Sequence, residues 1–259
     1  MSKNGIMSCI DQIPYDEVNV METLNEEAVK MLRQDRWQKI TKNTQIPSDN
    51  MESKLLNSLT RELMRQIDQM INPQTAKQIL CNTRHGLKHF HFSWVRERFL
   101  EYNDIDIFCS VMKKENIESF TRAVESGKYY HGQPVDHSVL QFVIDHPYLL
   151  YGARDENKIK AIAIPCETQK YLKEMNLNKK RYYACHCPFA RHSILEVEGT
   201  VSKILCNCSL GHTKVFWEAA LDTKLQGRVI NSVLGDGLLC CFEIDLPDEV
   251  MNRYVHKSE

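Results

Sequence analysis

The sequence predicts an α+β fold, with a mainly helical N-terminal half packed on a C-terminal α/β layer that ends in a β-hairpin. Through residues 54–71, apolar side chains recur every three or four positions, as on one face of an amphipathic helix. After residue 147, short runs typical of strands become frequent. Gly235-Asp236-Gly237 joins the last two of these runs and is a strong turn signal. The chain has 259 residues, 42% of them hydrophobic, so it can bury a substantial core.

Helices account for most of the elements predicted before residue 147. The amphipathic helix starts at Lys54, carries Leu63 and Ile67 on its apolar face, and ends at Asn72-Pro73. The helices expected in this half cover residues 26–40, 54–71, 73–80, 93–102, 104–114, 117–125 and 137–145.

Strands and helices alternate in the predicted C-terminal layer. In its last strand, Cys240, Phe242 and Ile244 are expected to face the core, and Cys241 and Glu243 to face water or a cleft, because successive side chains on a strand point to opposite sides. The strands expected here cover residues 158–164, 181–187, 201–206, 225–234 and 238–246, and the helices cover 167–175, 188–195 and 209–221.

These elements divide the chain into three parts. We expect an N-terminal extension over residues 1–50, a helical region over 51–147 and a cysteine-rich α/β domain over 148–259. One compact domain over 51–259 is the alternative.

Charge and composition narrow the class of protein. Lysine and arginine (33) nearly cancel aspartate and glutamate (34), so no net field favours nucleic acid or an anionic membrane as a partner. The N-terminus does not read as a signal peptide, and no run is apolar enough to span a bilayer. We therefore expect a cytoplasmic protein whose partner is a small-molecule ligand or substrate, with a homodimer left open. In a reducing compartment the ten cysteines stay free as core residues, metal ligands or nucleophiles.

Two Cys-x-Cys pairs are the main candidates for chemistry. Cys185 and Cys187 would point to the same side of a strand, and Cys187 precedes Pro188, where a helix is expected to begin. Cys206 and Cys208 repeat this arrangement at a second expected strand-to-helix junction. The positive end of a helix dipole lowers the pKa of a thiol and stabilises the thiolate, which is the nucleophilic and metal-binding form. The pairs would meet where open α/β sheets place ligands, unless they simply fill the core.

Four cysteine thiolates could hold zinc, or less readily an iron–sulfur cluster. The candidate ligands are Cys185, Cys187, Cys206, Cys208 and Cys240. As catalytic groups we expect Cys187 or Cys208 as nucleophile and His212 as acid, base or ligand.

Histidines elsewhere are weaker candidates. His85, His89 and His91 lie far from the cysteines in sequence and are more typical of solvated or hydrogen-bonded structural residues. Of these, His89 is retained as a candidate. His186 should point away from its two neighbouring cysteines and be structural.

Three segments resemble a group of bacterial proteins of uncharacterised function that share the order CHCPF, CNCS-G and GD…CxF. They are RYYACHCPFARHSIL at 181–195, VSKILCNCSLGHTKVFWEAAL at 201–221 and SVLGDGLLCCFEIDLP at 232–247, with RHGLKH at 84–89 and GQPV at 132–135 as further shared blocks. The progression is more distantly similar to the L-2-amino-thiazoline-4-carboxylic acid hydrolase family and to 4-vinyl reductase-type ligand-binding domains. The second family implies a small-molecule pocket and, in some members, a zinc held by cysteines and a glutamate.

This chain departs from that zinc pattern. Its turn reads GDGLLC instead of GD-x-x-C, and Asn231 and Ser232 stand where a glutamate and a cysteine are expected. Cys240 matches the final cysteine of the pattern, so Cys206 or Cys208 would have to supply the missing ligands.

Two classes of function follow. The first is an enzyme, with the hydrolase resemblance implying cleavage of a C–N bond in a small cyclic or amidine-like substrate by a cysteine thiolate or a cysteine-bound metal. The second is a non-catalytic domain that binds a small molecule and is braced by zinc. We favour the enzyme, because no DNA-binding or ATPase segment accompanies the candidate binding domain.

Overall fold

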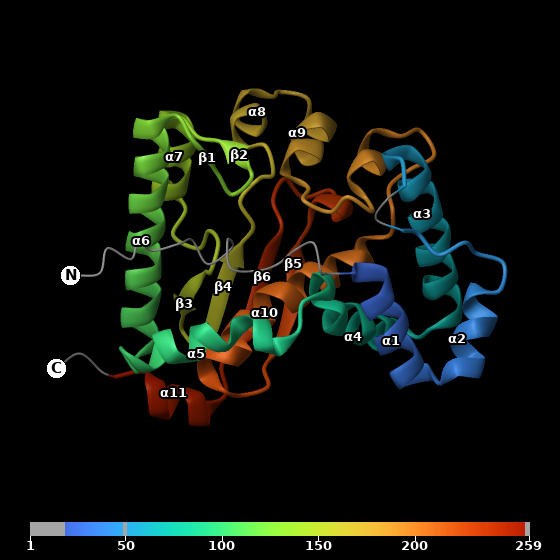
Figure 1. The fold of residues 1–259 in the computed structure, drawn as a ribbon, viewed down its shortest axis with the longest axis horizontal. Helices are drawn as coiled ribbons and strands as arrows, with labels where there is room; N and C mark the ends of the chain where they lie inside the picture. The colour runs from blue at the N-terminus through green and yellow to red at the C-terminus, as the bar shows by residue number, and fades with distance from the viewer. Residues whose placement is uncertain (1–18, 49–50, 257–259) are drawn as a thin grey trace.

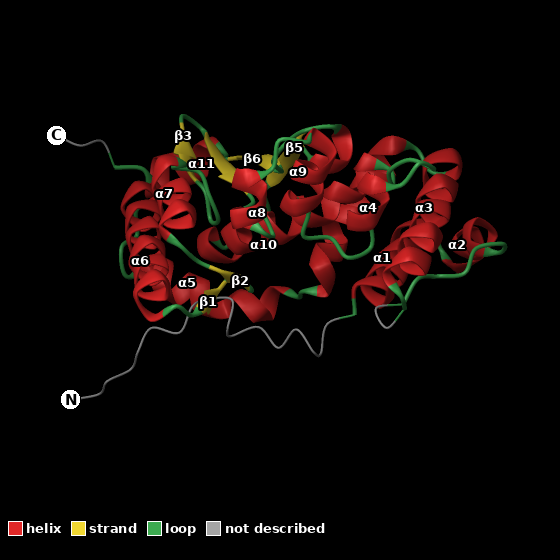
Figure 2. Cartoon of the chain, turned by 90° about the horizontal axis from the view of Figure 1, so that it is seen from above, coloured by secondary structure: helices red, strands yellow, loops and turns green. Residues whose placement is uncertain are grey.

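The computed structural model describes residues 19–48 and 51–256, in which helices pack against one face of a four-stranded antiparallel sheet (Figure 1). The strand order is β3-β4-β6-β5, and a short β1-β2 pair stands apart. Two views place α6 at one end of the molecule, α1 to α3 at the other, and α10 between them (Figures 1 and 2). Helices dominate the first half and the larger sheet lies in the second, so the predicted α+β class is confirmed.

The elements have the following bounds. The α-helices are α1 (Val20–Leu32), α2 (Gln34–Thr41), α3 (Ser53–Met70), α4 (Pro73–Thr83), α5 (Ser93–Leu100), α6 (Ile105–Ser126), α7 (His137–Asp145), α8 (Thr168–Lys173), α9 (Leu177–Ala184), α10 (Asn207–Leu221) and α11 (Asp248–Tyr254). The strands are β1 (Tyr129–Tyr130), β2 (Gln133–Pro134), β3 (Ala153–Asp155), β4 (Lys158–Ile162), β5 (Gln226–Asn231) and β6 (Cys241–Asp245). Short 3-10 turns are η3 (Arg84–Gly86), η4 (His89–Phe92), η5 (Arg191–Leu195), η6 (Lys203–Cys206) and η7 (Val233–Gly235).

The larger sheet has one apolar and one charged face. Ile159 of β4 pairs with Ile244 of β6, and Ala161 pairs with Phe242; all four side chains are buried. Helix α10 packs on β5 and β6. On the opposite face, Glu243 forms ion pairs with basic side chains of both neighbouring strands. The predicted hairpin and the inward orientation of Phe242 and Ile244 are thereby confirmed.

The predicted amphipathic helix is α3, in which Leu63 and Ile67 are buried. Asn72 caps the next helix, because its side chain accepts the N–H of Thr75. The two helices expected over 104–114 and 117–125 are one continuous helix, α6. The helix expected over 26–40 is instead α1 and α2, separated at Arg33, whose φ of 70° interrupts the helical backbone.

Two predicted strands are wrong. Residues 181–184 belong to α9, which Asn176 starts by accepting the N–H of Lys179, and residues 203–206 form the 3-10 turn η6. The helix expected over 188–195 is only the 3-10 turn η5. The alternating pattern of such short segments does not distinguish a strand from a short helix or turn, because burial on one side of a short helix or turn gives a similar pattern. The sheet is also antiparallel, so the expected meeting of parallel strand ends does not apply.

The cysteine segments lie where two hydrophobic cores meet. One core contains Cys185 and Cys206 and is built mainly from the N-terminal helices and the segment that follows α9. The other contains the inner face of the sheet and most of α10. Cys240 packs against both cores. Helix α10 also contacts α4 and α5, so the two halves of the chain touch directly; the domain boundaries stay predictions.

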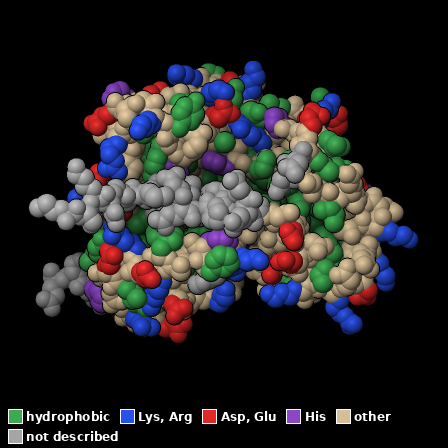
Figure 3. Space-filling model, in the orientation of Figure 1, with side chains coloured by type: hydrophobic (Ala, Val, Ile, Leu, Met, Phe, Trp, Pro, Cys, Tyr) green, Lys and Arg blue, Asp and Glu red, His purple; other side chains and the backbone are tan. Residues whose placement is uncertain are grey.

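Basic and acidic side chains are interspersed over the face seen in Figure 3. This matches the near balance of the two signs in the sequence. Among residues 19–48 and 51–256, none of the helices is both long and apolar enough to cross a membrane.

Candidate thiol and imidazole site

The two Cys-x-Cys pairs lie at helix ends. Cys185 is the C-terminal cap of α9, and Cys187 follows in the turn that leads to η5. Cys206 is the N-terminal cap of α10, and Cys208 lies in the first turn of that helix. The second pair therefore occupies a helix start, as predicted, whereas the first pair leaves a helix instead of a strand.

All five cysteines proposed as metal ligands lie near one another. Cys185 is close enough to Cys187 and Cys206 for their charges to raise its pKa, although burial is the larger cause. Cys187 is influenced in the same way by Cys208 and Cys206. Cys240 lies close enough to Cys206 and Cys185 for both to raise its pKa. The start of α10 thus gathers sulfur atoms from three separate parts of the chain.

A backbone N–H is aimed at the sulfur of Cys208. The N–H of His85 donates to the Cys208 Sγ over 3.1 Å. Three successive residues hold this geometry with positive φ angles, namely Arg84 (52°), His85 (55°) and Gly86 (79°). Non-glycine residues rarely adopt this left-handed conformation, and such strain is concentrated at functional sites.

His85 contacts Cys208 through its backbone and His212 through its ring. Its Nε2 is hydrogen-bonded to the Ser209 Oγ at 3.1 Å, and the ring stacks on that of His212 with 5.0 Å between centroids. Cys208 and His212 are one turn apart on the same side of α10. His85, Ser209, Cys208 and His212 therefore form one continuous group, which we call the thiol–imidazole site.

Burial decides the protonation of this site. It raises the pKa of the Cys208 thiol to about 12, against the opposing effect of the His85 N–H. It lowers the pKa of His85 to about 3 and that of His212 to about 4, and nearby imidazoles add to both shifts. Burial also raises the pKa of Cys187, although the N–H groups that follow it donate to its sulfur. The resting site holds neutral thiols and neutral imidazoles, so the predicted lowering of the Cys187 and Cys208 pKa values is wrong.

Cys206 is the thiol whose pKa is lowered. The main cause is a hydrogen bond from the thiol of Cys240, with further donation from the Ser232 side chain and the Leu234 N–H. The same contact raises the pKa of Cys240. None of these donors belongs to the start of α10, so the lowered pKa of Cys206 does not come from the predicted helix-start effect.

The sulfur atoms do not form a ready-made metal site. In the described part of the chain, no group of three or more histidine, cysteine, aspartate or glutamate side chains is arranged to hold a metal ion. Tetrahedral zinc and an iron–sulfur cluster both need four ligands. Zinc and the iron–sulfur cluster stay predictions from the sequence, and no chemical step is derived through them.

The remaining histidines have other surroundings. The Nε2 of His186 is hydrogen-bonded to the carbonyl of Ile164, in keeping with the expected structural role. His91 contacts the backbone of Lys88 through its Nδ1. The side chain of His89 lies outside the described part of the structure.

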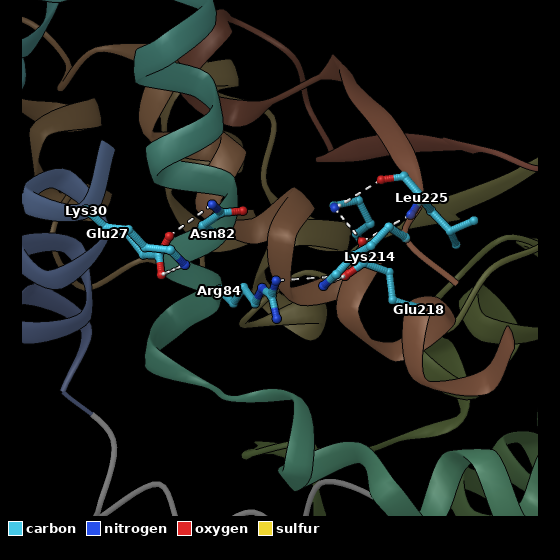
Figure 4. A network of polar contacts seen from close by, with 8 residues as sticks. Glu27, Lys30, Asn82, Arg84, Lys214, Glu218 and Leu225 are labelled. Carbon is cyan, nitrogen blue, oxygen red and sulfur yellow. Dashed lines mark hydrogen bonds and ion pairs between the residues drawn. The ribbon is translucent and has the colours of Figure 1, made fainter. Parts of the chain in front are cut away.

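A buried carboxylate anchors the strained turn (Figure 4). Glu218 of α10 is 1% exposed and accepts hydrogen bonds from Lys214 Nζ (2.7 Å) and the N–H of Leu225 (3.1 Å). Its second oxygen lies 3.9 Å from Nη2 of Arg84, the residue immediately before His85. This ion pair links η3 to α10 and is the longest of the three that Glu218 forms, since Lys214 and Lys224 lie closer to its carboxylate. The sequence did not indicate this role.

The segment after Cys187 is anchored separately. Asn57 of α3 is fully buried and donates to the carbonyl of Pro188 over 2.8 Å. Its Oδ1 accepts the N–H of Ser193 over 3.1 Å. The segment after Cys187 is therefore fixed by a buried polar side chain of α3, a helix far away in the sequence.

Comparison with protein-family models, with curated proteins and with solved structures found no match to this chain.

Proposed function

We propose that the protein is an enzyme that hydrolyses a C–N bond of a small cyclic or amidine-like substrate, with Cys208 as nucleophile and His212 as its proton acceptor. The observation that supports this most is the hydrogen bond from the His85 N–H to the Cys208 Sγ. The left-handed backbone of η3 directs this N–H at Cys208, which lies at the start of α10. The substrate class rests on the resemblance of the cysteine segments to the hydrolase family.

The proposed chemistry uses neighbouring groups of the thiol–imidazole site. As Cys208 attacks the electrophilic carbon, its proton passes to His212, and the developing charge is stabilised by the His85 N–H and by the N-terminus of α10. The C–N bond breaks when the imidazolium returns the proton to the departing nitrogen. Water then hydrolyses the enzyme-bound carbon and regenerates the thiol. Ser209 positions the ring of His85 beside His212.

A neutral resting thiol is compatible with this sequence of steps. Proton transfer from Cys208 to His212 is unfavourable in the empty site, because both charged forms are buried. The proton therefore has to leave Cys208 while the sulfur attacks the substrate. Until then the thiol is neutral, which protects it from other electrophiles. Cys187, which lies within electrostatic reach of Cys208, is the alternative nucleophile.

Substrate screening with Cys208→Ala tests the proposal. The purified protein is incubated with small cyclic amidines and amides, including 2-aminothiazoline-4-carboxylate, and products are followed by mass spectrometry. We expect at least one compound to be hydrolysed, and Cys208→Ala to lower its turnover by roughly a thousandfold or more.

Cys109→Ala is the matched control. Cys109 is also buried, and burial raises its pKa to about 12, but it lies in α6 outside the site. This variant should keep full turnover. No hydrolysis of any compound, or equal loss in both variants, would contradict the proposal. Elemental analysis of the same samples tests the alternative of a binding domain braced by zinc, which requires about one zinc per chain.

A further inference from the structure

The junction between α8 and α9, which we call the α8–α9 turn (residues 174–177), exposes two apolar side chains. Met175 is 89% exposed and Leu177 is 63% exposed, and the turn lies at the upper edge of the molecule in Figure 1. Single exposed apolar residues are ordinary on protein surfaces. Here two of them stand together at an outermost turn, so one partner surface can take both out of water at once.

Hydrogen bonds within the turn fix it in this conformation. The Glu174 Oε1 accepts the N–H of Met175 over 3.0 Å and the N–H of Asn176 over 2.8 Å. Asn176 in turn caps α9, because its Oδ1 accepts the N–H of Lys179 over 3.0 Å. The backbone is held by the polar side chains of the turn itself, and this arrangement leaves Met175 and Leu177 pointing outward.

Lysines flank the exposed pair on both helices. Lys173 ends α8, two positions before Met175, and Lys179 lies in the first turn of α9. Between positions 168 and 180 the sequence has four lysines, and Glu174 is its only acidic residue. The α8–α9 turn therefore carries a local positive charge, although the whole chain is nearly neutral.

The other two lysines lie between the two helices. The Lys180 Nζ of α9 is 4.8 Å from the centre of the Tyr171 ring of α8. The Lys170 Nζ of α8 is 5.5 Å from the centre of the Tyr183 ring of α9. Lys170 is also ion-paired with Glu167, so the other three lysines supply most of the available charge. Basic side chains of both helices thus belong to one surface behind the exposed pair.

We propose that the α8–α9 turn docks the protein on an anionic membrane surface, with Met175 and Leu177 inserted among the lipids and the flanking lysines against the headgroups. This inference does not rest on the proposed hydrolysis. Apolar side chains gain free energy when they leave water for the acyl boundary, and each lysine near anionic headgroups adds electrostatic attraction. The expectation of no membrane partner came from the charge of the whole chain, which does not describe this local surface.

Lipid fits the surface better than nucleic acid does. Phosphates of a nucleic acid would be matched by the lysines alone, whereas the aliphatic pair at the tip of the turn needs an apolar environment. Val197 provides a comparison within the same chain. It is fully exposed, but it lies between Glu196 and Glu198, which an anionic surface would repel.

Co-sedimentation with lipid vesicles tests the proposal. The full-length protein is mixed with sucrose-loaded vesicles of phosphatidylcholine alone, or of two parts phosphatidylcholine to one part phosphatidylserine, and the pelleted fraction is measured. We expect binding to the phosphatidylserine vesicles, little binding to phosphatidylcholine alone, and release at about 0.5 M sodium chloride. The double variants Met175→Ser/Leu177→Ser and Lys179→Gln/Lys180→Gln should each lower the partition coefficient roughly tenfold or more.

Two matched controls accompany these variants. Val197→Ser removes an exposed apolar side chain beside glutamates, and Lys39→Gln/Lys42→Gln removes two exposed lysines at the end of α2, at another edge of the molecule (Figure 1). Both should bind vesicles as the native protein does, and far-ultraviolet circular dichroism verifies that each variant is folded. The proposal is overturned if neither vesicle pellets the protein, if the controls lose as much binding as the turn variants, or if single-stranded RNA retains the protein and vesicles do not.

Discussion

Gly211→Ala is expected to destabilise the protein by roughly 3 kcal/mol or more, the upper range for overpacking a core. A Cβ added at Gly211 of α10 would lie 1.8 Å from the carbonyl oxygen of Cys81 and 2.7 Å from its carbonyl carbon. Both atoms belong to the backbone of α4, so no side-chain rotation relieves the contact. Alanine improves helix propensity by only about 1 kcal/mol, and the steric effect should therefore dominate.

The same substitution should disturb the thiol–imidazole site. Helix α4 continues directly into η3, and pushing it from α10 moves the His85 N–H away from Cys208. Urea unfolding measures the stability. Gly127→Ala is the control, because nothing lies within 4 Å of its added Cβ and its φ of +65° should cost only about 1 kcal/mol. Equal, small losses in both variants would show that α4 and α10 are not packed this closely.

Acidification from pH 7 to pH 5 is expected to lower the free energy of unfolding, and this is the second large effect. Burial holds the pKa of His85 at about 3 and of His212 at about 4, below the ordinary value of 6.5. The unfolded chain therefore binds more protons than the folded one below pH 6.5. Stability is complete above that pH and falls by about 1.4 kcal/mol per pH unit for each histidine until the folded pKa is reached. Most carboxylates titrate lower, and burial also lowers the pKa of His186, so these three imidazoles should dominate this window.

Urea unfolding at several pH values between 7 and 5 checks the slope. His212→Phe keeps an aromatic ring beside His85 and removes one of these titrating groups, so its slope should be shallower than that of the native protein. His137→Gln, at an exposed position at the start of α7, should keep the native slope. A native stability that is independent of pH in this range would mean that the imidazoles are not buried.

Patterns that extend over many residues of the sequence predicted the fold better than patterns confined to short segments. The repeat of apolar residues over α3 and the alternation around Phe242 and Ile244 extend over enough positions to identify helix and strand. Residues 181–187 and 201–206 are too short for either period, and the polar cap at Asn176 decides for a helix in the first case. The break between α1 and α2 at Arg33 depends on tertiary packing, which the helix propensities of single residues do not describe.

The site was predicted in part for the same physical reason. Cys-x-Cys spacing pointed to Cys208, which one turn of α10 places on the same side as His212. His85 is 123 positions from Cys208, and its contact depends on three left-handed residues and on Glu218. The block RHGLKH was the only sequence signal for it. The direction of the pKa shifts also needed the structure, because burial outweighs the helix dipole.

Labelling with 2-chloroacetamidine tests most directly whether Cys208 is the reactive thiol of an amidine-binding site. This reagent carries an amidine group attached to a chloromethyl carbon, which alkylates thiols. Peptide mapping after brief exposure at pH 7 should find the adduct on Cys208, ahead of the more accessible Cys166 and Cys241, and His212→Gln should slow it. An adduct found mainly on Cys166 and Cys241, with Cys208 unmodified, would contradict a nucleophilic role for Cys208.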